Sequence, residues 1–233
     1  MTTSVTSSTS FFAQLQEQTA SDQQGLLAIP FVRAAVAGRL TRAEYLAFLG
    51  QAYHHVRHTV PLLMATGARL GPERPGLQAA LAEYIAEERG HEQWILNDIE
   101  AAGGDARAVA RGQPELPCEV LVAYAYDQVT RRDPLGFFGM VHVLEGTSVR
   151  AATQAAQALG ESLQLPPSAF SYLSSHGCLD QDHVAFFGQL VDGLPDPAEQ
   201  QVILRAARAF YRLYGDLFRN LSPRQQPRSV ETR

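Results

Sequence analysis

The sequence predicts an all-α protein, a single bundle of six or seven long helices. Long segments with apolar residues at helical spacing fill most of the chain, and short turns rich in proline and glycine separate them. β-Branched residues do not alternate with polar ones between turn dipeptides, as they would in strands. At 233 residues, 45% of them hydrophobic, the chain can bury one substantial core. We therefore expect one helical domain over residues 11–221, between disordered tails at 1–10 and 222–233.

The expected helices follow from residues that start or stop a helix. Thr41 and Glu44 have capping-box spacing, so a long helix should begin after Thr41, with Pro61 able to kink it. Asp133 and Asp196 each precede a proline, which combines an N-cap with the residue best suited to the first helical position. In full, we expect a short helix at 11–18 and long ones at 41–71, 75–102, 117–132, 133–159, 167–193 and 196–221.

Composition excludes several classes of function. The net charge is −5, so the composition gives no sign of the excess positive charge that nucleic-acid-binding proteins carry. All 19 basic residues are arginine. Without lysine the chain can form neither a lysine Schiff base nor a P-loop. Cys118 and Cys178 are too far apart for a CxxC pair and indicate reduced thiols. The sequence shows neither a signal peptide nor a membrane span, so we expect a cytoplasmic protein with no membrane partner.

The stretch from His176 to His183 carries the first functional pattern. His176, Asp180 and His183 have the spacing i, i+4 and i+7, so on a helix they form one stripe. Two imidazoles and a carboxylate on one side of a helix are a usual way to hold a first-row metal ion. An exposed polar face is the alternative, although the apolar residues that follow indicate a helix with a buried side.

Two other helices could supply the remaining ligands. Glu145 follows an apolar run, so its carboxylate should be buried and needs a metal ion, an arginine or a proton to offset the cost. Glu88 and His91 have the i, i+3 spacing known from carboxylate-bridged metal sites in helical bundles. Three carboxylates and three imidazoles suit two divalent iron ions. The predicted ligands are Glu88, His91, Glu145, His176, Asp180 and His183, and we expect no catalytic residue beyond them.

Residues beside these motifs admit more than one interpretation. His142, one turn before Glu145, either pairs with that carboxylate or lies beside a substrate. Tyr84, two turns before His91, should face the ligand side. Glu87 and Glu92 belong to a charge run that is more typical of a solvated helix face.

The first long helix offers further polar residues. His54 and His58 are spaced i, i+4, but no carboxylate shares their face, which favours packing, substrate contact or support of the ligands over metal binding. Arg57 and Arg150 could clamp a substrate carboxylate, although surface or structural roles are the commoner ones.

Taken in order, Glu88-x-x-His91, Glu145-Gly146 and His176-xxx-Asp180-xx-His183 resemble the motifs of the heme-oxygenase-like diiron oxidases and oxygenases. The resemblance extends from the first long helix to the sixth. It implies a heme-oxygenase-like up-down helical bundle of about seven helices, with the six predicted ligands around two irons. Some members have an additional carboxylate at the position of Tyr84, so the chain departs from the pattern there. This departure either weakens the second iron site or places an oxidisable phenol beside the cluster.

The resemblance further implies a non-heme enzyme that uses two Fe(II) ions, O2 and an external reductant to oxidise a small molecule. Amine N-oxygenation, C–C cleavage and oxidative decarboxylation are family reactions, and amino acids, amines and fatty-acid-like molecules are candidate substrates. Manganese in place of iron and a homodimer both remain open. The alternative is a cofactorless quinone-synthase-like oxidase or a thiaminase-II-like hydrolase. The hydrolase needs a nucleophilic cysteine, and Cys178 fits poorly because at i+2 from His176 it points away from the stripe.

Overall fold

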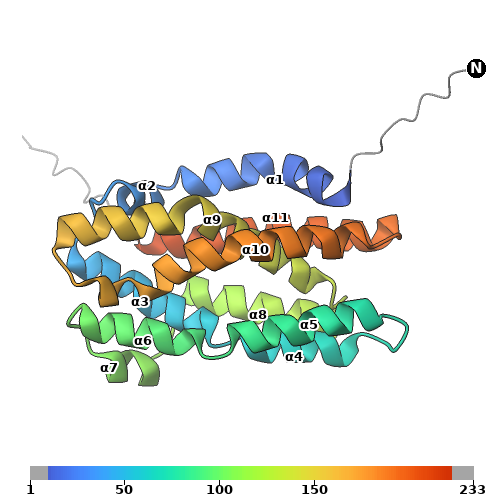
Figure 1. Ribbon diagram of the computed structural model, residues 1–233, viewed down its shortest axis with the longest axis horizontal. Helices are drawn as coiled ribbons and strands as arrows, with labels where there is room; N and C mark the ends of the chain where they lie inside the picture. Colours follow the sequence, from blue (N-terminus) through green and yellow to red (C-terminus); the bar gives the residue numbers. More distant parts are fainter. Residues whose placement is uncertain (1–9, 222–233) are drawn as a thin grey trace, which may run out of the picture.

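The computed structural model describes residues 10–221, apart from the side chains of residues 177–182. The described residues form helices and no strand, which confirms the all-α prediction (Figure 1). None of these helices is both long enough and apolar enough to cross a membrane. Of the predicted tails, only Ser10 lies in the described range, where it caps the first helix. The helices are α1 (Phe11–Leu27), α2 (Pro30–Val36), α3 (Arg42–Val56), α4 (Thr59–Arg69), α5 (Pro75–Glu88), α6 (His91–Ala101), α7 (Ala106–Arg111), α8 (Leu116–Arg131), α9 (Gly136–Leu163), α10 (Ser171–Asp192) and α11 (Pro197–Leu221), with a 3-10 turn, η1 (Pro167–Ala169), before α10.

The long helix α9 is central to the bundle. It packs most extensively against α10 and α11, and α2 packs on it as well. Most helices run nearly parallel to the long axis of the molecule (Figure 1). The sequence explains the central position, because the first half of α9 is apolar nearly all round and Phe137, Phe138, Met140 and Val143 are all buried.

Gly139 explains how closely α9 approaches α11. A Cβ atom at Gly139 would lie 2.6 Å from the backbone nitrogen of Ala207 and 2.9 Å from the carbonyl oxygen of Ile203. Both are backbone atoms that cannot rotate away, so the contact requires glycine. Gly139 therefore sets the spacing between α11 and the helix that carries Glu145.

The predicted helix at 75–102 is broken in two. α5 ends at Glu88 and α6 begins at His91, because Gly90 has a φ of 96°, a left-handed conformation that a continuous α-helix cannot contain. The prediction of one unbroken helix was wrong at this point. The break falls between two of the predicted metal ligands.

The predicted helix at 41–71 is also broken. α3 ends at Val56 and α4 begins at Thr59, so Pro61 lies in the first turn of α4, where its missing N–H needs no partner. Pro61 thus belongs to the start of a helix and does not kink the middle of one. Together with the short α2 and α7, which were not predicted, the two breaks raise the number of helices above seven.

Two predicted helix starts are confirmed. The hydroxyl of Thr41 accepts a hydrogen bond from the N–H of Glu44, and the Glu44 carboxylate accepts one from the N–H of Thr41, which completes the capping box. The carboxylate of Asp196 accepts a hydrogen bond from the N–H of Ala198 at 2.8 Å, and α11 begins at Pro197. Local sequence therefore determines where these helices begin.

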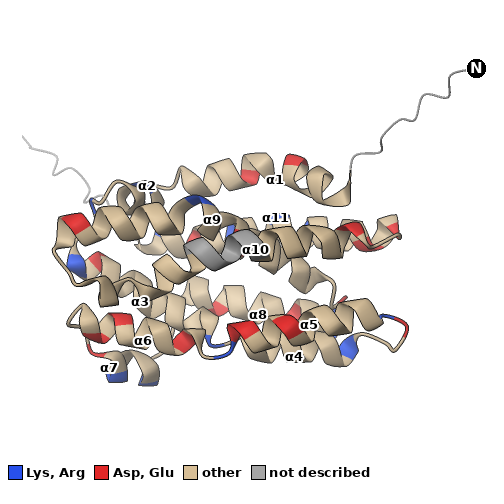
Figure 2. Cartoon of the chain, viewed as in Figure 1, with Lys and Arg blue, Asp and Glu red and all other residues tan. Residues whose placement is uncertain are grey.

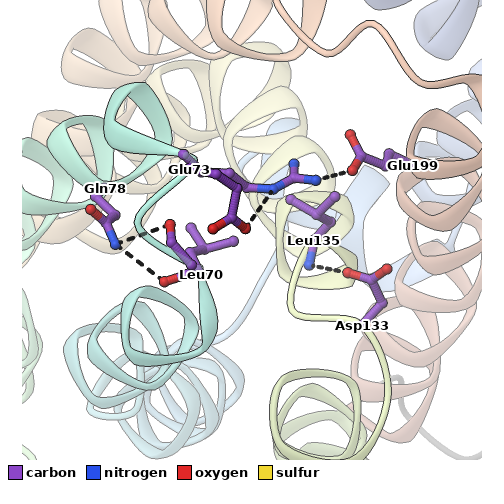
Figure 3. Close-up of polar contacts among 8 residues, drawn as sticks. Leu70, Glu73, Gln78, Asp133, Leu135 and Glu199 are labelled. Atoms are coloured by element: carbon purple, nitrogen blue, oxygen red, sulfur yellow. Dashed lines mark hydrogen bonds and ion pairs between the residues drawn. The ribbon is translucent and has the colours of Figure 1, made fainter.

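The start of α9 was predicted too early. The carboxylate of Asp133 accepts a hydrogen bond from the N–H of Leu135 at 3.0 Å, so it caps a turn that precedes the helix (Figure 3). α9 itself begins at Gly136. In the neighbouring turn between α4 and α5, Arg74 forms an ion pair with Glu199, which ties that turn to α11 (Figure 3).

Candidate metal centre

Glu88 and His91 are in contact on either side of the break between α5 and α6. Glu88 is the last residue of α5 and His91 the first of α6, and Oε2 of Glu88 lies 3.0 Å from Nδ1 of His91. The expectation that both lie on one helix was wrong, but the contact is present. The two side chains are 12% and 4% exposed, so both are shielded from bulk water. Figure 2 shows acidic residues near the point where α5 meets α6.

His176 of α10 joins this pair. Glu88, His91 and His176 each offer one donor atom, and the three atoms lie within 4.8 Å of one another, close enough to share a metal ion. Nδ1 of His176 is 3.0 Å from the carbonyl oxygen of Tyr172, which can only accept a hydrogen bond. The proton is therefore on Nδ1, and Nε2 keeps its lone pair. A carbonyl partner of this kind is usual for a histidine that binds metal.

His183 of α10 lies close to a different oxygen of Glu88. Its Nδ1 is 3.9 Å from Oε1 of Glu88 and 3.9 Å from Oε1 of Glu145. Its Nε2 is 2.9 Å from Oε2 of Glu87, so Glu87 orients the ring and is more than part of a solvated charge run. The side chain of Asp180, the remaining predicted ligand, lies outside the described residues.

Glu88 is the common member of these contacts. Oε2 faces His91 and Oε1 faces His183. Burial works to raise the pKa of Glu88, but the hydrogen bond to His91 and the imidazoles of His91, His176 and His183 outweigh burial and hold the pKa below its usual value. Glu88 is therefore ionised at neutral pH, which is the form that binds a metal ion.

Tyr84 lies beside the same carboxylates. It is 2% exposed, and its ring centroid is 5.7 Å from that of His183. Burial, and then the charges of Glu145 and Glu88, raise the pKa of Tyr84 well above its usual range. The phenol therefore stays protonated next to the candidate ligands.

Asp98 fixes α6 relative to α10. Its carboxylate accepts hydrogen bonds from the N–H of Ser171 at 3.0 Å, from the Ser171 hydroxyl, and from the N–H of Tyr172 at 2.9 Å. It thereby caps the N-terminus of α10 while being fully buried. One carboxylate thus joins the helix of His91 to the helix of His176. Sequence reasoning missed Asp98 because its partners lie 73 and 74 residues further along the chain.

An apolar cavity of about 140 Å³ adjoins the centre and is lined in part by Glu88 and His176. The lining extends along α9 from Phe137 to Leu159, which is roughly 33 Å of helix at 1.5 Å per residue. Most of the lining side chains are apolar. Among the described residues, the acidic ones in the lining are Glu88 and Glu145.

His55 reaches this cavity, although it was not singled out from the sequence. It is 2% exposed, and its Nδ1 has no hydrogen-bond partner among the described residues. Burial and the neighbouring histidines, His176 first among them, lower the pKa of His55 to about 3, so its ring is neutral. Helical periodicity could have found His55, because Tyr45 and Phe48 on the same face of α3 also line the cavity.

Other predicted residues of α3 and the turn after it lie elsewhere. His54 is buried with its ring centroid 5.5 Å from that of Tyr53, and it does not line the cavity. Arg57 is exposed and lies 5.5 Å from the centroid of the Tyr53 ring. Nδ1 of His58 is 3.1 Å from the hydroxyl of Tyr126. The structure therefore places His54 and Arg57 away from the candidate metal centre and gives them packing contacts.

His142 belongs to a separate cluster of buried polar and aromatic side chains. Its Nε2 is 3.0 Å from the hydroxyl of Thr19, whose single proton is donated to the carbonyl of Leu15. His142 is therefore the donor of this hydrogen bond. The rings of Phe12, Phe187 and Tyr211 lie around it, and burial lowers its pKa to about 4. The structural partner of His142 is thus Thr19 on α1.

A second cavity, of about 320 Å³, lies between α1 and α9. Gln16, Gln23 and Arg150 contribute polar groups to its lining. Arg150 is exposed, so its side chain reaches this cavity from the surface. Glu145 lines both cavities.

Cys118 is not placed as a nucleophile. Its Sγ donates a hydrogen bond to the carbonyl of Gln51 at 3.4 Å, and burial raises the pKa of the thiol to about 12. The side chain of Cys178 lies outside the described residues. Within the described part of the chain, no cysteine is available for the hydrolase alternative.

Comparison with known proteins identifies the fold family. The solved structures that resemble this chain include a domain of unknown function with a heme oxygenase-like fold from Shewanella denitrificans. It is 20% identical, with 89% of this chain and 90% of that chain covered and a TM-score of 0.81. A TenA homologue from Pseudomonas syringae is 13% identical, with 92% and 93% covered and a TM-score of 0.76. Heme oxygenase-1 from the cyanobacterium Synechocystis, in complex with heme, is 14% identical, with 92% and 93% covered and a TM-score of 0.72.

At such low identities these structures establish the fold alone, and they confirm the predicted heme-oxygenase-like bundle. No protein with curated annotation matches the sequence. The model of a family described as iron-containing redox enzymes matches residues 46–215, which is most of the chain. This protein therefore belongs to the iron-containing redox enzyme family.

Proposed function

We propose that this protein is a non-heme diiron enzyme that uses O2 to oxidise a small organic molecule. One observation carries the proposal. Oε2 of Glu88 lies 3.0 Å from Nδ1 of His91, while Oε1 lies 3.9 Å from Nδ1 of His183, which is also 3.9 Å from Oε1 of Glu145. A donor atom of His176 lies within 4.8 Å of donor atoms of Glu88 and His91. A carboxylate in that position suits the bridge between two divalent ions.

The donor chemistry fits iron. Carboxylate oxygens combined with imidazoles suit iron or manganese, whereas structural zinc sites use more sulfur and nitrogen, and magnesium or calcium sites use oxygen. Two of the histidines have their other ring nitrogen held by an acceptor, His176 by the Tyr172 carbonyl and His183 by Glu87. The proposed ligands are Glu88, His91, Glu145, His176, Asp180 and His183.

Two ferrous ions held by these residues would supply O2-dependent redox chemistry, with electrons from an external reductant. The residues of the chain have their own tasks. Asp98 keeps the helices of His91 and His176 in register. The apolar lining of the cavity would position the substrate beside the metal ligands. Tyr84 holds its proton beside Glu88 and Glu145.

The donor set differs from that of a heme site, where one or two axial residues such as histidine hold the iron. Here carboxylates and imidazoles from several helices converge beside an apolar cavity. This arrangement is suited to a small substrate next to a non-heme metal centre.

The test is anaerobic loading with Fe(II), metal analysis, and then exposure to O2 while the visible spectrum is followed. Trp94 is the single tryptophan and stacks on His91 with ring centroids 4.0 Å apart, so its fluorescence should report metal binding. We expect about two irons per chain and a transient visible absorption after O2 is added.

Both signals should be lost in His176→Ala and in Glu145→Ala. The matched control is His54→Ala, which removes a buried histidine outside the cavity and should keep both signals. A single iron in the wild-type protein would contradict the diiron proposal. An absence of iron binding and of any response to O2 would favour the hydrolase or cofactorless alternative on the same fold.

A further inference from the structure

We propose that the apolar cavity binds a small, mainly apolar molecule whose one uncharged hydrogen-bonding group contacts His55. The inference rests on the proposed function, since it names the substrate class of the same centre. Binding, however, can be measured on the metal-free protein. Its success or failure is therefore separable from that of the metal proposal.

The size of the molecule is limited by the cavity. An apolar cavity of about 150 Å³ accommodates a molecule of the size of benzene, so a cavity of about 140 Å³ accepts a small ligand. We therefore expect an upper limit to the length of the apolar chain that binds.

The apolar body follows from the small side chains along α9. Ala151, Ala152 and Ala155 line the cavity, and Val32 and Ala35 of α2 line it as well. Larger side chains at these positions would close the space that α2 and α9 leave between them. Each square ångström of apolar ligand surface buried here contributes about 25 cal/mol. The alanines therefore set the length of the chain that the cavity accepts.

The hydrogen-bonding group follows from two buried atoms. His55 and Ser148 line the cavity, and Nδ1 of His55 and Oγ of Ser148 have no hydrogen-bond partner among the described residues. Leaving such an atom unpaired costs about 1–3 kcal/mol, which a polar group on the ligand would recover. His176 lines the same cavity, so a group held by His55 lies near the proposed metal ligands.

The charge of that group follows from the acidic lining. Glu88 and Glu145 are the acidic residues described in the lining, and no described lysine or arginine is there to offset them. A free carboxylate on the ligand would be repelled by both in the metal-free protein. We therefore assign an uncharged group, such as a hydroxyl or an amide, to the contact with His55.

The experiment uses metal-free, full-length protein and straight-chain primary alcohols from hexan-1-ol to dodecan-1-ol. Binding is followed by Trp94 fluorescence and by isothermal titration calorimetry. We expect the affinity to reach a maximum within this series and to fall once the chain is longer than the cavity. Octan-1-ol should bind about 3- to 10-fold more tightly than octane, because only the alcohol forms the hydrogen bond.

Two variants locate the contacts. His55→Phe should abolish the preference for octan-1-ol over octane while binding of octane persists, and His54→Phe, its neighbour outside the cavity, should leave the preference unchanged. Ala155→Leu adds three carbon atoms to the lining, so the optimal alcohol should become shorter by about three carbons. Gln154→Leu, an exposed change beside it, should not shift the optimum.

Three outcomes would overturn the proposal. These are no binding of any alcohol, an affinity that rises without limit through dodecan-1-ol, and a preference for octan-1-ol that survives in His55→Phe. None of them bears on iron binding, which is measured separately. If the protein shows the expected alcohol series but binds no iron, the proposed function is wrong. The cavity would then still be assigned as a binding site.

Discussion

His142 and His55 are both buried histidines, but their surroundings differ. His142 donates to Thr19 and is enclosed by aromatic rings, so its hydrogen-bonding capacity is used within the fold. His55 lines a cavity beside the candidate metal centre, and its Nδ1 has no hydrogen-bond partner among the described side chains. Burial keeps both rings neutral. A buried polar group with an internal partner stabilises the fold, whereas one that lacks a partner is available to a ligand.

The largest expected effect is on the free energy of unfolding, and it concerns Asp98, which joins α6 to α10. Asp98→Ala leaves three hydrogen-bond donors at the start of α10 without their acceptor, so the free energy of unfolding should fall by about 4 kcal/mol. Urea denaturation measures the loss. Asp105 caps the short α7 at the surface, so Asp105→Ala is the control and should cost about 1 kcal/mol. Equal losses in the two variants would show that the link between α6 and α10 is unimportant.

The next effect concerns His142 and pH. The pKa of His142 is lowered from 6.5 to about 4, so between these pH values the ring is neutral in the folded protein and protonated in the unfolded chain. The stabilisation is complete above pH 6.5 and is lost as the pH falls toward 4. The wild type should lose up to about 3 kcal/mol of its free energy of unfolding as the pH falls, and His142→Phe should not show this loss. At pH 7 the same variant should be less stable than the wild type by about 1 kcal/mol, because the hydrogen bond to Thr19 is missing.

Urea midpoints of the metal-free protein between pH 7 and pH 4 measure this dependence. The wild type should lose more stability over that range than His142→Phe. His55→Phe should flatten the same curve, because the pKa of His55 is also lowered, to about 3. An unchanged pH dependence in both variants would mean that these two rings are not neutral in the folded protein.

A smaller effect is expected on the affinity for Fe(II), which should depend on His176 but not on His142. His176→Ala removes one of the three converging donors, so the affinity for Fe(II) should fall by about 100-fold, or about 2.7 kcal/mol. His142→Phe should leave the affinity unchanged. Quenching of Trp94 fluorescence during anaerobic titration measures both. A similar loss of Fe(II) affinity in the two variants would show that His142 also contributes to the metal centre.

The smallest effect concerns the residue that orients His183. In Glu87→Gln the amide oxygen can still accept from Nε2 of His183 but the charge is gone, so metal affinity should fall by about tenfold. Glu83 is exposed one turn earlier on α5, and Glu83→Gln should have no effect. If both variants bind metal equally well, the contact between Glu87 and His183 does not tune the site.

Local sequence was sufficient for much of the fold. Thr41 and Asp196 mark helix starts because a cap acts within a few residues of itself. The break at Gly90 was not foreseen, since glycine is tolerated inside many helices and its conformation depends on the packing of the flanking segments. The short helix expected at 11–18 continues to Leu27, and α1 packs on α11, a contact that the local pattern does not contain.

The candidate site was partly foreseen for the same reason. Glu88, His91 and His176 do converge, because their spacing within each segment and the apolar surroundings were visible in the sequence. Asp98 and His55 were missed because their roles depend on side chains or space contributed by distant helices. His142 was associated with Glu145 by proximity along the chain, while its partner, Thr19, lies 123 residues away.

The left-handed turn at Gly90 constrains how this sequence can change during evolution. Nothing lies within 4 Å of the position that a Cβ atom would take there, so crowding does not require glycine. The requirement is torsional, and an ordinary residue at this φ would cost about 1–2 kcal/mol, a loss that many folded proteins survive. Such a substitution would favour one straight helix, on which Glu88 and His91 still lie three residues apart on one face. It would change the direction in which α6 leaves α5, and with it the position of His91 relative to His176 on α10. Natural selection for activity, more than for folding, would then keep glycine at this position.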